Sequence, residues 1–184
     1  MVSKKVNVKG KADGIPVYCC FDEIVDIKKL NPNPLNPNKH PKEQVEKLAF
    51  IIKTNGWRSP ITVSTRSGMI VKGHGRLEAA KLLKVKEVPV DYQDYENESQ
   101  EYEDLLADNR IAELSETDNK ILLELFHEYD NGANNIELTG YTDEDYKNLA
   151  SALDEYMKKE EQAETEPKAK KTVICPHCGM EVLV

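Results

Sequence analysis

The chain of 184 residues is long enough for one ordinary domain with appendages, and its 39% hydrophobic and 32% charged residues are typical of a soluble protein with a modest core. No apolar run approaches the ~20 residues that a membrane-spanning helix needs, and no apolar segment follows the basic N-terminus as in a secretory signal. We therefore expect a cytoplasmic protein that does not bind membranes.

The formal net charge of −8 is divided unevenly along the chain. Residues 1–90 carry 17 Lys and Arg against 8 Asp and Glu, a net charge of +9, whereas residues 91–184 carry 8 against 25, a net charge of −17. The basic half favours a phosphate-bearing partner, although solvated faces of opposite sign would give the same pattern. Because the acidic half would repel DNA, the balance favours a small phosphorylated ligand or a partner protein over stand-alone DNA binding.

The first part of the chain combines a tail, a strand and a loop. Residues 1–14 are rich in Lys and Gly and predict a flexible basic tail, and the apolar run over 15–21 predicts a strand. The four prolines of residues 31–41 exclude helix and sheet and predict an extended polar loop. Loops often carry binding residues, although Asn-Pro turns alone would explain this composition. The polar side chains that could face a ligand here are Asn33, Asn36, Asn38 and His40.

Helical and strand patterns then alternate up to residue 92. The predicted helices cover residues 42–54 and 74 to about 84, where apolar residues recur at helical spacing. The predicted strands cover residues 60–64, 69–71 and 88–92, and the first two form a hairpin. This interleaving is typical of the α/β and α+β classes.

The sequence Gly73-His74-Gly75-Arg76 joins the predicted strand 69–71 to the helix that follows. Glycine lets the backbone turn tightly or approach a ligand closely, and the start of a helix offers unpaired N–H groups to an anion. Arg76 adds a fork of donors suited to phosphate or carboxylate. These residues therefore indicate a phosphate-binding corner, which we call the glycine corner. A tight turn with a structural arginine explains the four residues equally well when they are taken alone.

The remainder of the chain is mostly helical. Apolar periodicity predicts helices over residues 99–114, 118–129 and 142–157. Residues 158–172 are rich in Lys and Glu and predict a charged linker. The predicted organisation is a domain over 15–114, a helical extension over 115–157, the linker, and a short tail over 173–184.

The tail contains Cys175-Pro-His-Cys178 followed by glycine, the spacing of one knuckle of a zinc ribbon. A structural zinc site needs four ligands, and this knuckle supplies two, or three if His177 takes part. Two tails pairing across a homodimer would complete the site. A tail without metal, carrying two free thiols, is the alternative.

The ordered series of loop, helix, Pro-Ile-Thr-Val, hairpin, Gly-His-Gly-Arg-Leu-Glu-Ala-Ala and Val-Pro-Val resembles the ParB/sulfiredoxin-like N-terminal domain family over roughly residues 16–155. The branch is similar to one common in bacteriophages and mobile elements, often called a ParB-like nuclease domain and often found ahead of DNA methylases. The resemblance implies an α+β fold, with a small mixed sheet, flanking helices and a helical C-terminal extension.

The resemblance also implies a site for a nucleoside triphosphate, CTP or ATP, with a metal ion. The residues that would contact the phosphates are Gly73, His74, Gly75 and Arg76. Asp108 and Asn109 would lie near the phosphates and the metal, and their oxygen atoms suit Mg²⁺. Chromosome-partitioning relatives carry an arginine three residues after that asparagine, where this chain has Ala112, and Arg110 stands next to Asn109 instead.

These features predict a phage-type protein in a bacterial cytoplasm that binds a nucleoside triphosphate with Mg²⁺, and could hydrolyse it, in DNA modification, partition or processing. His74 stands where sulfiredoxins have their reactive cysteine, which argues against their chemistry. The alternatives are a non-catalytic DNA-associated adaptor whose zinc-knuckle tail, Cys175 and Cys178, recruits a partner, and a metal-dependent nuclease. No helix-turn-helix is evident, so contact with DNA could be direct or through a partner.

Overall fold

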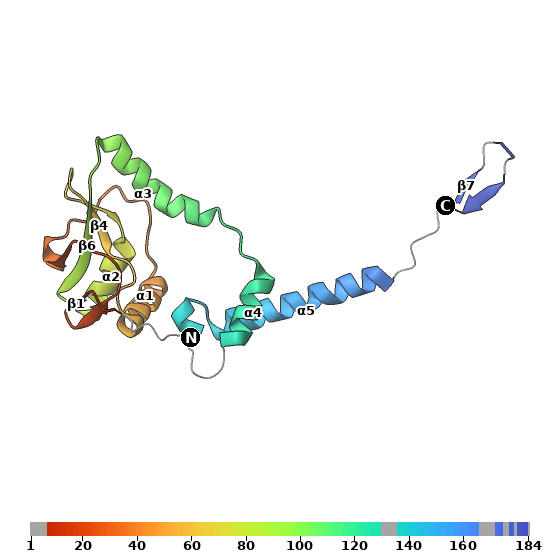
Figure 1. Cartoon of the computed structure of the whole chain (residues 1–184), viewed down its shortest axis with the longest axis horizontal. Coiled ribbons are helices and arrows are strands. Elements are labelled where there is room, and N and C mark those ends of the chain that lie inside the picture. The colour runs from red at the N-terminus through yellow and green to blue at the C-terminus, as the bar shows by residue number, and fades with distance from the viewer. Residues whose placement is uncertain (1–6, 130–135, 166–171, 175–176, 179, 184) are drawn as a thin grey trace.

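A computed structural model gives the fold of the chain and describes residues 7–129, 136–165, 172–174, 177–178 and 180–183. A compact body contains strands β1 to β6 with helices α1 and α2, and α3 leads from it toward a separate pair of helices, α4 and α5 (Figure 1). No helix in the described ranges is long and apolar enough to cross a membrane.

A four-stranded mixed sheet forms the centre of the body, in the order β3-β6-β4-β5. Its strands are β3 (Glu23–Asp26), β4 (Ile61–Ser64), β5 (Ile70–Lys72) and β6 (Glu87–Gln93). Strand β6 is antiparallel to β3 and parallel to β4, whereas β4 and β5 form the predicted antiparallel hairpin. The sheet therefore ends on one side with β5, the strand that leads into the glycine corner.

Two helices pack together beside this sheet, α1 (Lys42–Asn55) and α2 (His74–Leu83). Helix α1 buries Ala49 and Ile52, and α2 buries Leu77 with the two alanines that follow. Strand β6 contributes Val88 and Val90, both fully buried. Burial of each large apolar side chain contributes about 1.5–3 kcal/mol to the free energy of unfolding, so the corner between β5 and α2 rests on a rigid core.

Part of the expected flexible tail is ordered, which corrects the prediction for residues 1–14. Strand β1 (Gly10–Ala12) pairs with β2 (Ile15–Val17), and the side chain of Ala12 is completely buried. The two residues between the strands, Asp13 and Gly14, both have positive φ angles, of 46° and 84°. Asp-Gly favours such two-residue hairpin turns, and this local signal marks the start of the ordered domain.

Helix α3 (Glu98–Glu113) is attached to the sheet edge by a buried carboxylate. Glu101 is fully buried and accepts hydrogen bonds from Ser64 Oγ at 2.7 Å, Ser67 Oγ at 2.6 Å and Arg66 Nε at 3.0 Å. Leu105, one turn later, is also buried. The first two turns of α3 are therefore fixed against the β4–β5 hairpin.

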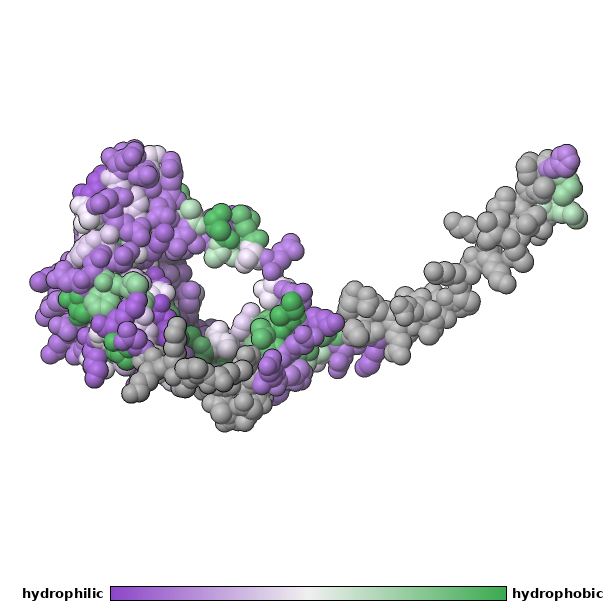
Figure 2. All heavy atoms as spheres, viewed as in Figure 1, coloured by the Kyte–Doolittle hydropathy of each residue, from purple (hydrophilic) through white to green (hydrophobic). Residues whose placement is uncertain are grey.

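The second half of α3 and the helix that follows expose apolar side chains, which Figure 2 shows as green surface on both helices. These exposed residues are Leu106, Ile111, Leu114, Ile121 and Leu125. The apolar periodicity of residues 99–114 thus predicted the helix, although most of its apolar residues beyond Leu105 do not reach the core.

The helical extension consists of α4 (Asn119–Tyr129), the 3-10 helix η2 (Ile136–Thr139) and α5 (Asp143–Thr165). The ring of Phe126 packs edge-to-face against Tyr141 and Tyr146, at centroid distances of 5.3 and 5.9 Å. Lys47 on α1 donates a hydrogen bond of 3.0 Å to the carbonyl of Gly140, which joins the extension to the body.

Helix α5 corrects the expected linker over residues 158–172, because it continues to Thr165. Residues 158–164 are Lys, Glu, Gln and Ala, which are strong helix formers and need no apolar periodicity to continue a helix already begun. Beyond it, β7 (Thr172–Ile174) and β8 (Glu181–Leu183) form an antiparallel hairpin around the cysteine knuckle. The α+β class, the small mixed sheet with flanking helices and the helical extension are confirmed.

Candidate functional site

The glycine corner is a strand-to-helix turn that presents the start of α2. Gly73 is the residue before the helix and has a φ of +96°, a conformation that L side chains rarely adopt. The first intrahelical bond runs from Leu77 N–H to the Gly73 carbonyl at 3.0 Å. The N–H groups of the three residues between them have no acceptor within the helix, and together with the helix dipole they favour an anion.

A pocket of about 180 Å³ lies over this turn, between the polar loop, α1, the corner and α3. Its lining residues are Asn36, His40, Gln44, Leu48, Val71, Lys72, Gly73, His74, Gly75, Arg76, Asp108 and Asn109. The volume is below the ~300–1,000 Å³ of pockets that enclose a drug-sized ligand. It therefore has room for a small polar group, such as a phosphate chain, and the rest of a larger ligand would lie outside it.

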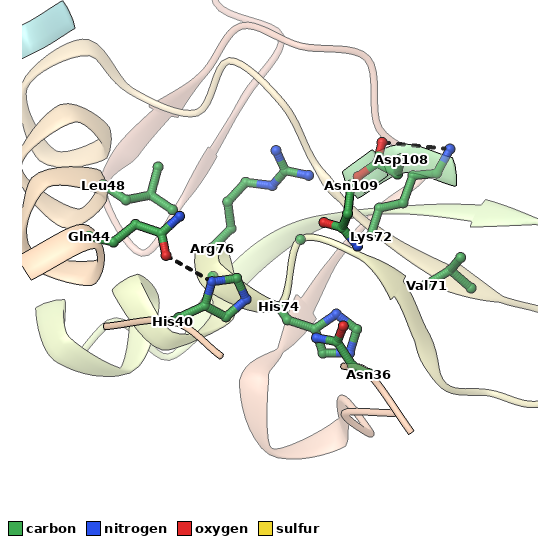
Figure 3. Close-up of a pocket in the computed structure, with 12 residues that line it drawn as sticks. Asn36, His40, Gln44, Leu48, Val71, Lys72, His74, Arg76, Asp108 and Asn109 are labelled. Carbon is green, nitrogen blue, oxygen red and sulfur yellow. Dashed lines mark hydrogen bonds and ion pairs between the residues drawn. The ribbon is translucent and has the colours of Figure 1, made fainter. Parts of the chain in front are cut away.

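Arg76 lies in the middle of the pocket, between a wall formed by His40 and Gln44 and a wall formed by residues of β5 and α3 (Figure 3). Its Nε is buried and has no hydrogen-bond acceptor among the described residues. Burial lowers the pKa of the Arg76 guanidinium, while Asp108 opposes this shift. A buried donor without an acceptor is costly, and an anion in the pocket would satisfy it.

Two histidines from distant parts of the sequence meet at the corner. His40 Nδ1 and Gln44 Oε1 are 3.1 Å apart, and His40 Nε2 is buried without a partner among the described residues. His74 Nε2 accepts a hydrogen bond of 3.2 Å from the backbone N–H of Asn33. Burial, followed by the charge of His40, lowers the pKa of His74. His74 is therefore a neutral imidazole that fixes the polar loop, while His40 offers a free ring nitrogen.

The α3 wall carries the negative charge of the site. Asp108 Oδ1 is 4.0 Å from Lys72 Nζ, and Lys72 pairs at 2.9 Å with Asp104, one turn earlier on α3. Asn109 donates from Nδ2 to the Leu105 carbonyl at 2.9 Å, which leaves its side-chain oxygen without a donor among the described residues. One carboxylate and one amide oxygen therefore face a pocket whose other side is cationic.

The structure brings together most of the residues singled out from sequence. Those that line the pocket are Asn36, His40, Gly73, His74, Gly75, Arg76, Asp108 and Asn109. Arg110 does not line it: the side chain is exposed and pairs with Glu113 at 2.8 Å on the outer face of α3. Asn38 does not line it either, and its backbone N–H donates to Asn36 Oδ1 at 3.2 Å.

Sequence reasoning missed two polar lining residues, Lys72 and Gln44. Lys72 is the last residue of β5, directly before Gly73. A basic residue next to the predicted phosphate-binding corner is a signal that the sequence alone contains. Gln44 follows His40 by four residues, across the start of α1, and only the fold shows that the loop places them in contact.

The cysteine knuckle is only partly described. Cys175 lies outside the described residues, and Cys178 is exposed with a free thiol. Within the described ranges, no group of three or more His, Cys, Asp or Glu residues could hold a metal ion. The zinc expectation at Cys175 and Cys178 stays a prediction.

Comparison with known proteins gives a family match over more than half of the chain. The family model described as the ParB N-terminal domain matches residues 18–117. The chain is 41% identical over 64 residues to the ParB-like nuclease domain-containing protein YnaK of Escherichia coli K12, a match covering 35% of this chain and 72% of that protein. It is 36% identical over 77 residues to the probable chromosome-partitioning protein ParB of Rickettsia prowazekii, covering 41% of this chain but only 27% of that relative.

Among solved structures, the chain resembles the C-terminally truncated chromosome-partitioning protein ParB of Caulobacter crescentus complexed with CTP-γ-S. The TM-score is 0.56 with 21% sequence identity, and the match covers 78% of this chain and 86% of that one. At this identity the likeness concerns the fold alone.

Proposed function

The chain belongs to the ParB N-terminal domain family, and from this premise we propose that it binds a nucleoside triphosphate, with Mg²⁺, at the Gly73–Arg76 corner. We further propose that it is a phage-type member that acts in the cytoplasm of a bacterial host, in DNA modification, partition or processing. We also propose that the C-terminal knuckle joins two copies of the chain in a homodimer or binds a partner protein.

The observation that carries nucleotide binding is a buried, unpartnered donor in the pocket, Nε of Arg76. This nitrogen lies beside the start of α2, and His40 Nε2 there is also buried without a partner among the described residues. Because His40 Nδ1 faces the accepting Gln44 Oε1, Nε2 is a donor only in the protonated ring. An uncharged ligand would leave the Arg76 guanidinium with the charge of Asp108 nearby but with no anion bonded to Nε. A phosphate chain would accept from Arg76 Nε and from the N–H groups at the start of α2, which makes it the best-matched ligand.

The α3 wall fits a magnesium ion that arrives with the phosphates. Mg²⁺ is usually bound by one or two carboxylates together with substrate phosphates and water. Asp108 and the side-chain oxygen of Asn109 would hold it here, since both line the pocket opposite Arg76. The ion would neutralise phosphate charge beside the carboxylate, so Asp108 and a phosphate could share the pocket without repulsion.

Relatives support a choice of nucleotide and a link to DNA. The Caulobacter structure contains CTP-γ-S, so CTP is the first nucleotide to test and ATP the second. The Rickettsia relative is named as a chromosome-partitioning protein, but this chain spans about a quarter of its length, so the DNA process stays a proposal. Hydrolysis of the nucleotide would need a group that accepts a proton from the attacking water. His74 Nε2 does not supply it in this arrangement, because it already accepts the hydrogen bond from the Asn33 N–H.

Isothermal titration calorimetry of the full chain with CTP and ATP, with and without Mg²⁺, tests this function. We expect Arg76→Ala to weaken binding by about tenfold or more, because a charge-assisted hydrogen bond contributes about 1.5–3 kcal/mol. Arg110→Ala is the matched control: it removes the same charge from an exposed position outside the pocket, so binding should be unchanged. Undiminished binding by Arg76→Ala, or no binding by the wild type, would contradict the proposal.

Two rival functions have separate readouts. A nuclease would nick plasmid DNA in the presence of Mg²⁺, and that activity should disappear in Asn109→Ala. The adaptor alternative concerns the tail of the chain, where Cys178 is exposed with a free thiol. An adaptor would capture a partner through the tail without turning over nucleotide.

A further inference from the structure

Lys72 is a basic residue of the pocket that the proposed glycine corner does not account for. It is the last residue of β5, one position before Gly73, and its side chain is only 24% exposed. It lines the same pocket as Arg76 and Asp108. Lys72 thus belongs to the same pocket lining as Arg76, whose Nε is buried.

The hydrogen bonds of this ammonium leave donors available. Lys72 Nζ is 2.9 Å from Asp104 Oδ1, which is a hydrogen-bonded ion pair. It is 4.0 Å from Asp108 Oδ1, which is too far for a hydrogen bond. An ammonium carries three N–H donors, and no described residue other than Asp104 accepts from this one. The remaining donors are available to an anion in the pocket.

Asp104 is itself fixed in a way that suits a positioning role. Its second oxygen, Oδ2, accepts a hydrogen bond of 2.8 Å from the hydroxyl of Tyr95. Burial raises the pKa of the Asp104 carboxyl, but the hydrogen bonds from Lys72 and Tyr95 together hold it below its usual value. The carboxylate therefore stays charged near neutral pH, and it does not line the pocket itself. It fixes the lysine without occupying the space that a ligand would need.

We propose that Lys72 is a second cationic contact for the phosphate chain and that Asp104 is the residue that positions it. This inference rests on the proposed nucleotide binding and adds a contact that the glycine corner lacks. Arg76 would reach the phosphates from α2 and Lys72 from the end of β5. Because Asp104 belongs to α3, a bound phosphate chain would connect three elements, and its affinity would depend on the attachment of α3.

The experiment compares Lys72→Met with Lys81→Met in the full chain. Lys81 is an exposed lysine on α2 that pairs with Glu78 at 2.7 Å and does not line the pocket, so both variants lose one charge and keep an apolar stem. Titration calorimetry with CMP, CDP, CTP and inorganic tripolyphosphate measures the affinities. We expect Lys72→Met to weaken CTP and tripolyphosphate about tenfold or more, with the loss growing from CMP to CTP, and Lys81→Met to leave all four within about twofold.

A double-mutant cycle tests the part assigned to Asp104. Asp104→Asn should weaken CTP binding in the wild-type background and add nothing in the Lys72→Met background, because it acts through that lysine alone. An equal further loss in both backgrounds would overturn the positioning role.

The outcomes also separate this inference from the function on which it rests. If Arg76→Ala loses CTP while Lys72→Met keeps it, nucleotide binding stands and the Lys72 contact is overturned. An equal loss for CMP, CDP and CTP would indicate that Lys72 only attaches α3, which also overturns it. If the wild type binds none of the four probes, both proposals fail.

Discussion

A methyl group at Gly73 would lie 2.9 Å from Nε of Arg76. The same glycine has a φ of +96°, so its backbone turns β5 into α2 in a conformation that L side chains rarely adopt. The residue therefore serves two purposes at once: it makes the turn, and it leaves the space in which the buried guanidinium lies.

Gly73→Ala should separate these two purposes when it is compared with Gly68→Ala. Gly68 also has a positive φ, of +69°, but a methyl group there would meet nothing within 4 Å. Both substitutions should lower the free energy of unfolding by roughly 1–2 kcal/mol through backbone strain, measurable by urea denaturation. Only Gly73→Ala should also weaken CTP binding, because it displaces Arg76. Equal affinities of the two variants would contradict the packing argument.

The buried carboxylate of Glu101 should be essential for stability. Glu101→Gln keeps the shape of the side chain but places an amide where three donors converge and removes the charge that Arg66 faces. We expect a loss of about 2–3 kcal/mol in the free energy of unfolding. Glu103→Gln, on the exposed side of the same helix, should change it by less than about 0.5 kcal/mol.

The effect of Glu101 should also depend on pH. Burial raises the pKa of its carboxyl, but the hydrogen bonds from Ser67 and Ser64 and the charge of Arg66 bring it below the usual value. Because the pKa is lower in the folded state, the contribution is complete at neutral pH and is lost as the pH falls below the ordinary glutamate range, about 4.3. Denaturation curves of the wild type and Glu101→Gln should therefore converge under acid conditions. A constant difference between them would show that the charge does not matter.

The parts of the fold that sequence predicted are those specified by local patterns. The periodicity of residues 42–54 predicts α1 because its apolar side chains recur on one face, and Gly73 predicts the turn because few other residues adopt its φ angle. The Asp13-Gly14 pair is an equally local signal for the first hairpin, whereas the Lys- and Gly-rich composition of residues 1–14 predicts a tail instead.

The parts that sequence did not predict depend on partners far along the chain. Glu101 is one acid among many in an acidic helix, and its burial follows from donors about 35 residues earlier that only the fold brings near it. Arg110 shows the opposite case: its position beside Asn109 suggested a ligand contact, but successive residues of a helix face different directions, so it points outward. Pattern and resemblance therefore identified the corner, and the fold was needed to choose among its neighbours.

The cysteine knuckle should bind zinc between two chains. A structural zinc ion takes four ligands, and the described hairpin β7–β8 frames a sequence that supplies two cysteines. Elemental analysis should give about half a zinc ion per chain, and a chelator should convert dimers to monomers in sedimentation experiments. Cys178→Ser should lose both the metal and the dimer, whereas Cys20→Ser, an exposed thiol in the body, should keep them. Monomers without zinc would support a tail with free thiols.

His74 should titrate at a lower pH than an ordinary histidine. Burial lowers its pKa first, and the nearby His40 lowers it further, against a smaller opposing effect of Glu78. Because the unfolded chain then binds the proton more readily, the free energy of unfolding should fall as the pH drops below the ordinary histidine value of about 6.5.

An NMR titration of the His74 ring measures this shift directly, with the resonance assigned by its absence from His74→Gln. His40→Ala removes the second cause, so the pKa of His74 should rise toward its ordinary value in that variant. Bound tripolyphosphate should raise it as well, because a nearby anion stabilises the imidazolium form. Protonation also removes the acceptor for the Asn33 N–H, so the protection of the Asn33 amide, measured against its intrinsic exchange rate at each pH, should decrease as the pH falls. A ring that titrates at or above about 6.5 without ligand would contradict both the burial and the hydrogen bond assigned to it.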